Sequence, residues 1–314
     1  MSASHHDDQP LQLPRLEEVS SGVYAYIQPD GSWWINNTGF LAGRRGVISI
    51  DACSTERRTR TYRRAIAEVT ARPITTLINT HHHGDHTFGN YLFPEATIVA
   101  HERTRELIMA EGIPEYRTFA WSPDVEWGHL EATPPFLTYS DRVTVYSDDL
   151  RCEVRHVGFA AHTTNDSYVW IPERRLLFAG DLAFNGGTPF VLMGSVTGGI
   201  EALDQLKELG AETVVPGHGD VCGPEVFDRV RGYLEFVLAT AERGRAAGLA
   251  PLEAARETDL GEWGELLDAE RIVGNLHRAY AELDGLPRGG QIDPVAALGD
   301  MITFNGGKPL SCLA

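Results

Sequence analysis

Four side chains of the kind that bind metal ions fall within six consecutive residues: His81, His83, Asp85 and His86. They directly follow the apolar segment 74–79, which predicts a buried strand. His81 and His83 are two residues apart, so both point to the same side of an extended chain, and Gly84 lets the chain bend back. Imidazole together with carboxylate suits Zn²⁺ and similar ions. This turn therefore predicts part of a metal site, with the intervening His82 facing the opposite side.

Three further candidate ligands each come soon after a predicted strand: His162, Asp181 and His218. Binding sites in α/β folds gather at strand ends, because the sheet holds the backbone there while the loops remain free to vary. Seven ligands are enough for two metal ions. Two divalent ions about 3.5–4 Å apart lower the pKa of a shared water to about 7, so the pattern predicts a hydrolytic centre.

Strands and helices are predicted in two successive rounds. The expected strands are 23–27, 36–41, 46–50, 74–79, 97–100, 143–145, 152–157, 167–171, 175–179 and 213–215. The expected helices are 55–72, 102–110, 200–209, 224–247, 251–257 and 268–284. Because both faces of each sheet need covering, this order predicts a layered α/β sandwich. We expect a flexible lead-in at 1–18, a core at 19–222 and a C-terminal helical extension at 223–314.

Composition narrows the possible partners and location. The formal net charge of −17 repels phosphate backbones, so we expect no nucleic-acid partner. The four cysteines show no C-x-x-C spacing, which is typical of ordinary thiols in a reducing cytoplasm. The first ten residues are polar and acidic, unlike a signal peptide, and no stretch of about 20 apolar residues predicts a membrane span. These features predict a cytoplasmic protein that acts on a small molecule.

The ordered set of motifs resembles the metallo-β-lactamase superfamily over about residues 20–222. The resemblance rests on H-x-H-x-D-H at 81–86, a lone His before Thr at 162, Gly-Asp at 180–181 and Gly-His-Gly at 217–219. It implies an αββα sandwich with two zinc ions at one edge, between the two sheets. It assigns His81, His83 and His162 to the first ion, Asp85, His86 and His218 to the second, and Asp181 to both. It also implies that Asp51 braces a ligand-bearing turn through hydrogen bonds without binding metal.

Several branches of this superfamily fit the chain poorly. Secreted β-lactamases need an export signal and usually carry Cys or Ser at the bridging position, where this chain has Asp181. RNA-processing members conflict with the acidic charge, and His83 stands where flavodiiron members carry Glu. Glyoxalase II grips glutathione with basic residues that have no obvious equivalent here. The activities that remain are hydrolysis of an ester, lactone or thioester, and carbonyl chemistry on the same metals.

Aromatic residues suggest the kind of substrate. Trp33 and Trp34 lie in a predicted hairpin loop that overhangs the active site in this superfamily, and Trp121 lies in an irregular segment at 111–138. Aromatic walls favour flat, apolar substrates. Packing of these rings within their own loops is the alternative interpretation.

The chain as a whole resembles the second-ring cyclases of actinomycete aromatic polyketide pathways. Its long helical tail and arginine-biased composition carry this likeness. It implies a poly-β-ketone thioester on an acyl carrier protein, closed by intramolecular aldol attack and then released by hydrolysis. Asp85, Asp181 and the metal-activated water are candidate bases for the C–H proton. An arginine cluster at 57, 58, 60, 63 and 64 is the candidate docking patch for an acidic carrier.

Two alternatives compete with this hypothesis. One is a lactonase or general acyl thioesterase of the same superfamily. The other is a non-catalytic carrier-binding protein with vestigial metal sites, which metal content would distinguish from an enzyme.

Overall fold

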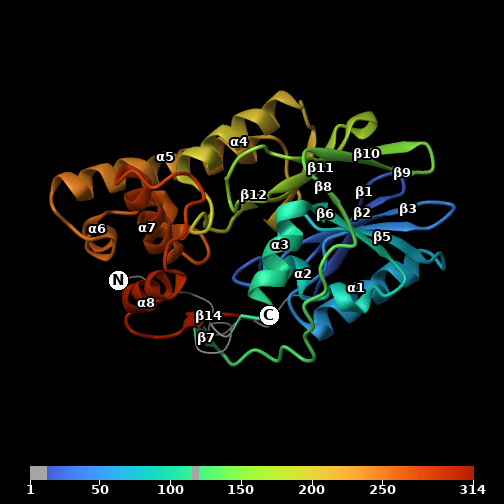
Figure 1. The fold of residues 1–314 in the computed structure, drawn as a ribbon, viewed down its shortest axis with the longest axis horizontal. Helices are drawn as coiled ribbons and strands as arrows, with labels where there is room; N and C mark the ends of the chain where they lie inside the picture. The colour runs from blue at the N-terminus through green and yellow to red at the C-terminus, as the bar shows by residue number, and fades with distance from the viewer. Residues whose placement is uncertain (1–12, 115–119) are drawn as a thin grey trace.

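The computed structural model describes residues 13–114 and 120–314, and its two sheets pack face to face between layers of helices (Figure 1). The strands of the larger sheet are, in spatial order, β1 (Arg15–Ser20), β2 (Val23–Ile27), β3 (Thr38–Ala42), β4 (Val47–Ile50), β5 (Ile74–Ile78), β6 (Thr97–His101) and β8 (Leu137–Tyr139). Those of the smaller sheet are β13 (Thr213–Gly219), β12 (Leu176–Asn185), β11 (Ser167–Ile171), β10 (Leu150–His156) and β9 (Arg142–Ser147). This arrangement confirms the predicted αββα sandwich.

The helices cover the outer faces of the sheets and continue into a C-terminal extension. The helices of the sandwich are α1 (Glu56–Val69), α2 (Gly84–Thr87), α3 (Glu102–Glu111) and α4 (Val196–Glu208). Those of the extension are α5 (Glu225–Ala246), α6 (Pro251–Glu257), α7 (Arg271–Leu283) and α8 (Pro294–Phe304). In Figure 1 the extension gathers at the end of the molecule away from the β9–β10 hairpin. Within the described ranges, no helix combines the length and apolar character needed to cross a bilayer.

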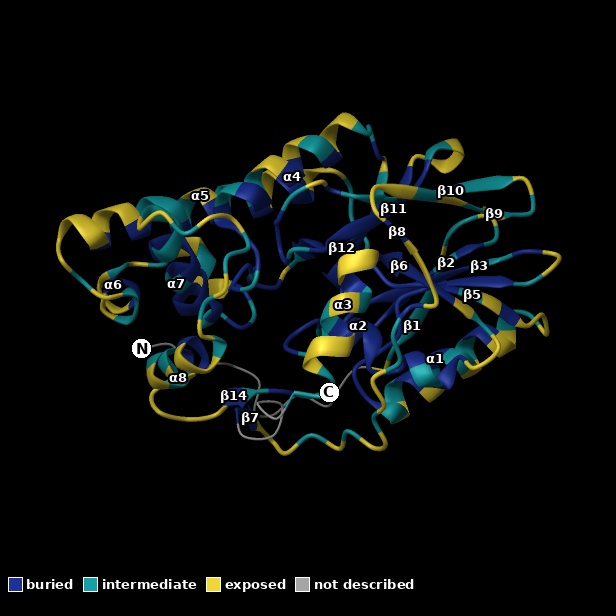
Figure 2. Ribbon diagram, viewed as in Figure 1, coloured by how far each residue is buried: buried dark blue, intermediate teal, exposed yellow. Residues whose placement is uncertain are grey.

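Three apolar layers hold the sandwich together. Between the sheets, Val23 and Ile27 of β2 belong to the same buried cluster as Val154 of β10. Tyr62 and Ile66 of α1 are buried against the outer face of the larger sheet. The third cluster joins the smaller sheet to α4 and the extension, and Figure 2 shows the buried residues on the inner faces of these helices. Burial of one stripe on each helix explains why an amphipathic sequence becomes a covering layer.

The lead-in predicted at 1–18 is wrong from Arg15 onward, and residues 1–12 lie outside the described part of the chain. β1 pairs antiparallel with β2, with Arg15 opposite Ile27, and Arg15 also forms an ion pair with Asp220 at 2.7 Å. The segment RLEEVS is too charged to suggest a strand by its hydrophobicity. An edge strand tolerates such side chains, because one of its sides and much of its surface face solvent.

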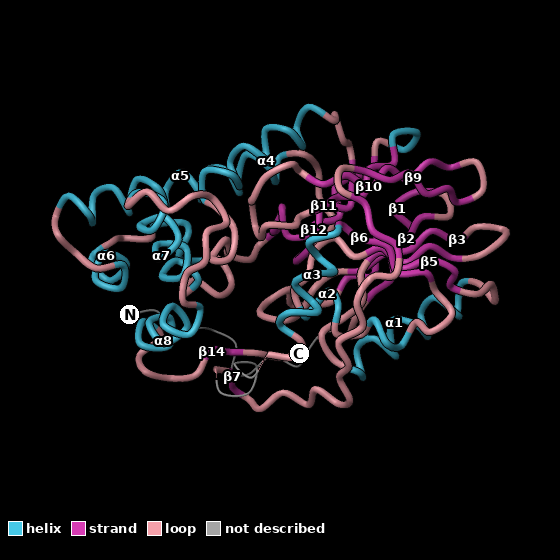
Figure 3. The backbone as a smooth tube through the Cα atoms, in the orientation of Figure 1, coloured by secondary structure: helices cyan, strands magenta, loops and turns pink. Residues whose placement is uncertain are grey.

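The end of the extension returns to the sandwich. The short strand β14 (Leu310–Ser311) pairs in parallel with β7 (Trp121–Ser122), a connection visible in the tube view of Figure 3. Leu310 N donates to Ala120 O at 2.7 Å, and Cys312 N donates to Ser122 O at 3.0 Å. β14 was not predicted, because it depends on a distant partner strand. α8 was also missed, although Asp293 caps its first turn and Pro294 begins it.

His101, at the end of β6, stacks on His156, at the end of β10, with ring centroids 3.9 Å apart and planes 17° from parallel. The stack joins the two sheets. Burial, followed by the neighbouring His101, lowers the pKa of His156 from 6.5 to about 4. The unfolded chain therefore binds a proton between about pH 6.5 and 4 that the folded chain excludes, and stability falls as the pH falls through that range.

We expect His156→Phe, which keeps a flat ring but cannot titrate, to reduce this acid sensitivity. Between pH 7 and pH 5 the free energy of unfolding should fall by about 1 kcal/mol less in the variant than in the wild type, a value that allows for partial exposure of the ring. Denaturant titrations at several pH values measure it. His129→Phe, at an exposed histidine, is the matched control, and parallel pH profiles for wild type and His156→Phe would contradict the assignment.

Candidate metal centre

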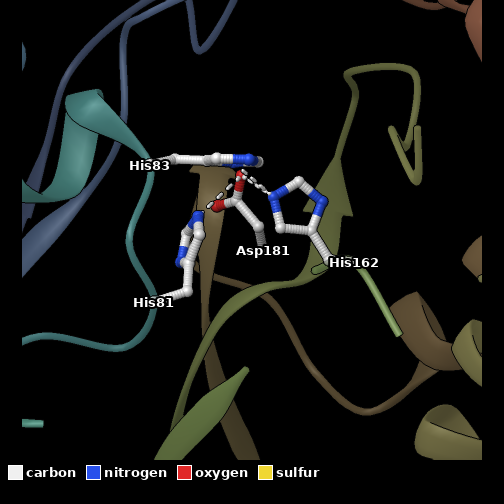
Figure 4. A group of neighbouring side chains, drawn as sticks. All are labelled: His81, His83, His162 and Asp181. Carbon is white, nitrogen blue, oxygen red and sulfur yellow. Dashed lines mark hydrogen bonds and ion pairs between the residues drawn. The ribbon is translucent and has the colours of Figure 1, made fainter. Parts of the chain in front are cut away.

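The structure brings all seven predicted ligands to one place. They form two overlapping groups, within each of which the ligand atoms lie within 4.8 Å of one another. The first group comprises His81, His83, His162 and Asp181, drawn in Figure 4, and the second comprises Asp85, His86, Asp181 and His218. Asp181 belongs to both groups, as expected of a carboxylate that bridges two ions.

Separate segments supply these side chains at one edge of the sandwich. His81 and His83 lie in the turn after β5, and Asp85 and His86 lie in the single turn of α2. His162 lies in the loop between β10 and β11, so in Figure 4 it approaches Asp181 from the side opposite His81. Both sheets contribute, since β5 belongs to the larger sheet and β10, β12 and β13 belong to the smaller one.

Asp181 and His218 lie within strands, whereas the sequence predicted strands that end at residues 179 and 215. β12 and β13 continue past both residues, but the register of their pairing shifts on either side of Gly180. Gly217 makes room for the carboxylate, since a Cβ at that position would lie 2.0 Å from Asp181 Oδ1. The irregular pairing and the missing side chain together let Asp181 face the centre.

Four of the imidazoles are oriented by hydrogen bonds on the ring nitrogen that points away from the centre. These Nδ1 contacts are His81 to Thr80 Oγ1 at 3.1 Å, His86 to Asp51 Oδ2 at 2.8 Å, His218 to Gly31 O at 3.1 Å, and His162 to Phe190 O. The carbonyl and carboxylate oxygens can only accept, and Thr80 Oγ1 gives its own proton to Asp51 Oδ2, so Nδ1 carries a proton in all four rings. When Nε2 carries no second proton, it presents a lone pair to the centre.

These lone pairs face carboxylate oxygens at short range. His86 Nε2 lies 3.1 Å from Asp181 Oδ1, and the Nε2 atoms of His162 and His218 lie 3.3 Å and 3.4 Å from Asp181 Oδ2. Among the described residues, His81 Nε2, His86 Nε2 and Asp181 Oδ1 are buried without a hydrogen-bond partner. Acceptors that face acceptors in a buried site require a cation between them, either a proton or a metal ion. The donor set therefore fits divalent metal ions such as Zn²⁺.

His83 differs from the other four histidines in the nitrogen that it offers. Its Nδ1 lies 2.9 Å from His162 Nε2, while its Nε2 contacts Met193 Sδ at 3.3 Å. The atom available to a cation is therefore Nδ1. His82 lies outside both groups, as predicted, and its Nδ1 lies 3.0 Å from Asn165 Nδ2.

The electrostatics of the centre favour the forms that bind cations. Burial alone would raise the pKa of Asp181, but the nearby His218, His86 and His162 hold that pKa well below its usual value. Burial, followed by neighbouring imidazoles, lowers the pKa values of His81 and His83. In contrast, Asp181 and Asp85 overcome the effect of burial and raise the pKa of His218 to about 9. A metal ion must displace a proton there, so binding should release protons.

Asp51 braces the ligand-bearing turn without entering either group. Its Oδ1 accepts from Thr80 N at 2.8 Å, and its Oδ2 accepts from Thr80 Oγ1 at 2.8 Å and from His86 Nδ1. Asp51 itself has a left-handed backbone, with φ of 59°. The carboxylate thus fixes both the turn after β5 and the ring of His86, which is the arrangement expected from the sequence.

A cavity opens onto the centre, and aromatic and apolar side chains make up much of its lining. The predicted pocket residues Trp33, Trp34 and Trp121 all line it. Trp33 packs 5.3 Å from Trp121 and Trp34 packs 5.7 Å from Trp121, measured between ring centroids. The three indoles therefore form one continuous wall, which we call the tryptophan wall.

The cavity also has lining residues that the sequence did not suggest. Phe184, Phe190, Leu192 and Met193 come from β12 and the loop after it, and the extension supplies Arg271, Pro294 and Leu298. None of them stands in a motif, and their role depends on how the extension packs against the sandwich. Apart from Arg271, the apolar character of these residues is the only signal in the sequence. It does not distinguish residues that line a cavity from residues of the core.

The fold and the centre define a class. Residues 31–218 match the family model described as the metallo-beta-lactamase superfamily, and the chain belongs to this superfamily, whose members are metal-dependent hydrolases. Among solved structures, the metallo-beta-lactamase from Pontibacter korlensis has a TM-score of 0.60 at 18% identity, over 71% of this chain and 99% of that one. At that identity the likeness shows the shared fold.

Curated relatives carry several different activities. The chain is 33% identical over 183 residues to 2,4-dinitroanisole O-demethylase subunit alpha of Nocardioides sp. (strain JS1661). The matched segment covers 57% of this chain and 51% of the relative. It is 24% identical to metallo-beta-lactamase type 2 of Bacteroides fragilis, over 69% of this chain and 83% of that one. It is 29% identical to hydroxyacylglutathione hydrolase of Rhodospirillum rubrum, over 60% of this chain and 62% of that one. The match thus spans only about half of the demethylase subunit.

We expect Asp51→Asn to weaken the second metal group about 10–100-fold, because an amide cannot accept all three hydrogen bonds that hold His86 and Thr80. Zinc bound per chain, measured against a competing chelator, should show one weakened site and one nearly unchanged site. Asp149→Asn, at a fully exposed carboxylate, is the control. Equal zinc affinity at both sites in Asp51→Asn and wild type would contradict the bracing role.

Proposed function

We propose that the protein hydrolyses a flat, aromatic acyl thioester and, within that class, acts as a second-ring cyclase and thioesterase of an aromatic polyketide pathway. The observation that carries the proposal is the tryptophan wall beside a centre with two sets of metal ligands. The aromatic and apolar lining of the cavity suits a flat aromatic group. The polyketide assignment also rests on the likeness of the whole chain to that family.

The residues that would hold the two Zn²⁺ ions are the two groups that share Asp181. When bound, such ions polarise an acyl or ketone carbonyl. They also lower the pKa of a bound water, which supplies hydroxide to attack the carbonyl carbon at neutral pH. The chain itself contributes carboxylates beside the cavity, since both Asp85 and Asp181 line it. Either carboxylate can accept the proton that an aldol closure removes from carbon.

The cavity walls contribute position and exclusion of water. Stacking on the tryptophan wall would hold a folded polyketide chain with its reacting carbons close together. The chain then loses less conformational entropy when the ring closes. Phe184, Leu192 and Met193 add apolar surface close to the metal ligands. A dry cavity also protects reactive ketones from side reactions.

Two relatives support parts of this proposal by their names. The demethylase subunit is named for 2,4-dinitroanisole, an aromatic molecule, and the hydrolase is named for an acylated glutathione. The second relative also favours a competing function, hydrolysis of small acyl thioesters or lactones. The two functions differ in whether the tryptophan wall contributes to catalysis.

We expect the zinc-loaded protein to hydrolyse an N-acetylcysteamine thioester of 2-naphthoic acid with a kcat/KM at least tenfold above that of the acetyl thioester and of a small lactone. Asp181→Ala should remove at least 99% of each activity while the circular dichroism spectrum persists, because the variant lacks the shared ligand. A faster reaction with the lactone or the acetyl thioester would favour the competing function. Full activity in Asp181→Ala would contradict the role of the centre.

An acyl carrier protein would need a basic surface, and the arginine cluster on α1 is only partly suited to this. Arg58 was wrongly included, because it is partly buried and donates to Gln28 Oε1 and Leu313 O. Arg60 pairs with Glu56 and Arg63 pairs with Glu95. Within the described chain, Arg57 and Arg64 have no acidic partner, and we propose these two as the docking charges.

Reversal of both charges, Arg57→Glu with Arg64→Glu, should raise the apparent KM for a carrier-bound thioester about tenfold at low salt, since rim charges act mainly on association. The KM for the free N-acetylcysteamine thioester should stay unchanged. Arg174→Glu with Arg229→Glu, at two exposed positions outside α1, controls for the same change in net charge. An unchanged KM for the carried substrate would remove this surface from the proposal.

A further inference from the structure

Trp33 is contacted on its edge and on its face by two consecutive residues at the start of α7. Its indole Nε1 donates to Glu270 Oε1 at 2.7 Å. The guanidinium carbon of Arg271 lies 4.0 Å from the centroid of the Trp33 ring. These two contacts join the tryptophan wall of the sandwich to the extension, across 237 residues of sequence.

Arg271 is itself held in place. It is 2% exposed, its Nη2 lies 2.9 Å from Asp268 Oδ2, and its Nη1 donates to Thr188 O at 2.9 Å. The charge is therefore paired and largely removed from water, which strengthens its attraction to the indole face. A fixed cation on one face of Trp33 leaves that ring little freedom to rotate.

The loop that carries Trp33 is also tied to the metal centre. Gly31, two residues earlier, provides the carbonyl that accepts from His218 Nδ1. Its φ is 84°, and a Cβ there would lie 2.7 Å from Gly219 N, so the loop can approach β13 this closely only with glycine. The backbone near Trp33 is thus fixed by a ligand histidine, and its side chain is fixed by α7.

We propose that Glu270 and Arg271 are positioning residues for Trp33 and that this contact sets the selectivity of the cavity for flat aromatic substrates. The inference rests on the proposed function, in which the tryptophan wall stacks on the substrate. Neither residue touches the metal ligands through any contact described above. Loss of the contact should therefore weaken binding of an aromatic ligand without emptying the centre.

The test compares Glu270→Leu, which cannot accept a hydrogen bond, with Glu270→Gln, which can. For metal-free protein titrated with the uncharged probe 2-acetylnaphthalene, quenching of tryptophan fluorescence should show about tenfold weaker binding in Glu270→Leu. The affinity of Glu270→Gln for the probe should stay within twofold of the wild-type affinity. Glu265→Leu, at an exposed glutamate of the same segment, should bind the probe as tightly as wild type. In zinc-loaded protein, KM for the naphthoyl thioester should rise in Glu270→Leu, while KM for the acetyl thioester and zinc content stay unchanged.

Wild-type affinity for the probe in a folded Glu270→Leu variant would overturn the inference, as would an equal rise in KM for the naphthoyl and acetyl thioesters. If Glu270→Leu does not fold, Glu270→Ala removes the same acceptor and should weaken binding of the probe to a similar extent. Trp33→Phe removes the donor of the same hydrogen bond, so Trp33→Phe combined with Glu270→Leu should bind the probe no more weakly than Trp33→Phe alone. If only the proposed function is wrong, binding of the probe should still depend on Glu270, but the protein should not turn over the naphthoyl thioester.

Discussion

The candidate centre depends on an electrostatic constraint: buried lone pairs face one another across a small space. Hydrogen bonds from the outer nitrogens of His81, His86, His162 and His218 place a proton on each of them, so each inner nitrogen offers a lone pair unless a second proton binds there. Asp181 meets them with two more acceptor oxygens. Without cations this arrangement is unfavourable, and with them it becomes a rigid pair of sites. The sheets, turns and glycines around it serve to maintain this geometry.

The extension adds a second layer of control that is separate from the ligands. It supplies Arg271 and two apolar side chains to the cavity, and it holds Trp33 from outside. The ligand-bearing part of the chain and the part that shapes the cavity are therefore largely distinct. This division is compatible with relatives that carry different activities, since a change in the extension can alter the cavity while the metal ligands stay in place.

The sequence predicted the parts of the molecule that depend on local pattern. The motif at 81–86, the lone His before Thr at 162 and the glycines beside Asp181 and His218 identified all seven residues that the structure brings together. It missed β1, because an edge strand can be charged, and it ended β12 too early, because the break in hydrophobic pattern there reflects metal ligands rather than the end of a strand. It could not find Glu270 or Arg271, whose roles arise only from contacts between distant segments.

The pairing of β14 with β7 has a consequence for how the protein is made. The last of the seven candidate ligands, His218, precedes all of α5 to α8 in the chain, whereas Leu310, which pairs with the strand that holds Trp121, follows them. Because the chain emerges from the ribosome from the N-terminus onward, the seven side chains of the candidate centre are made before the segments that close the cavity. The candidate centre can therefore assemble while the cavity is still open, and the cavity takes its final shape only after Leu310 has been made.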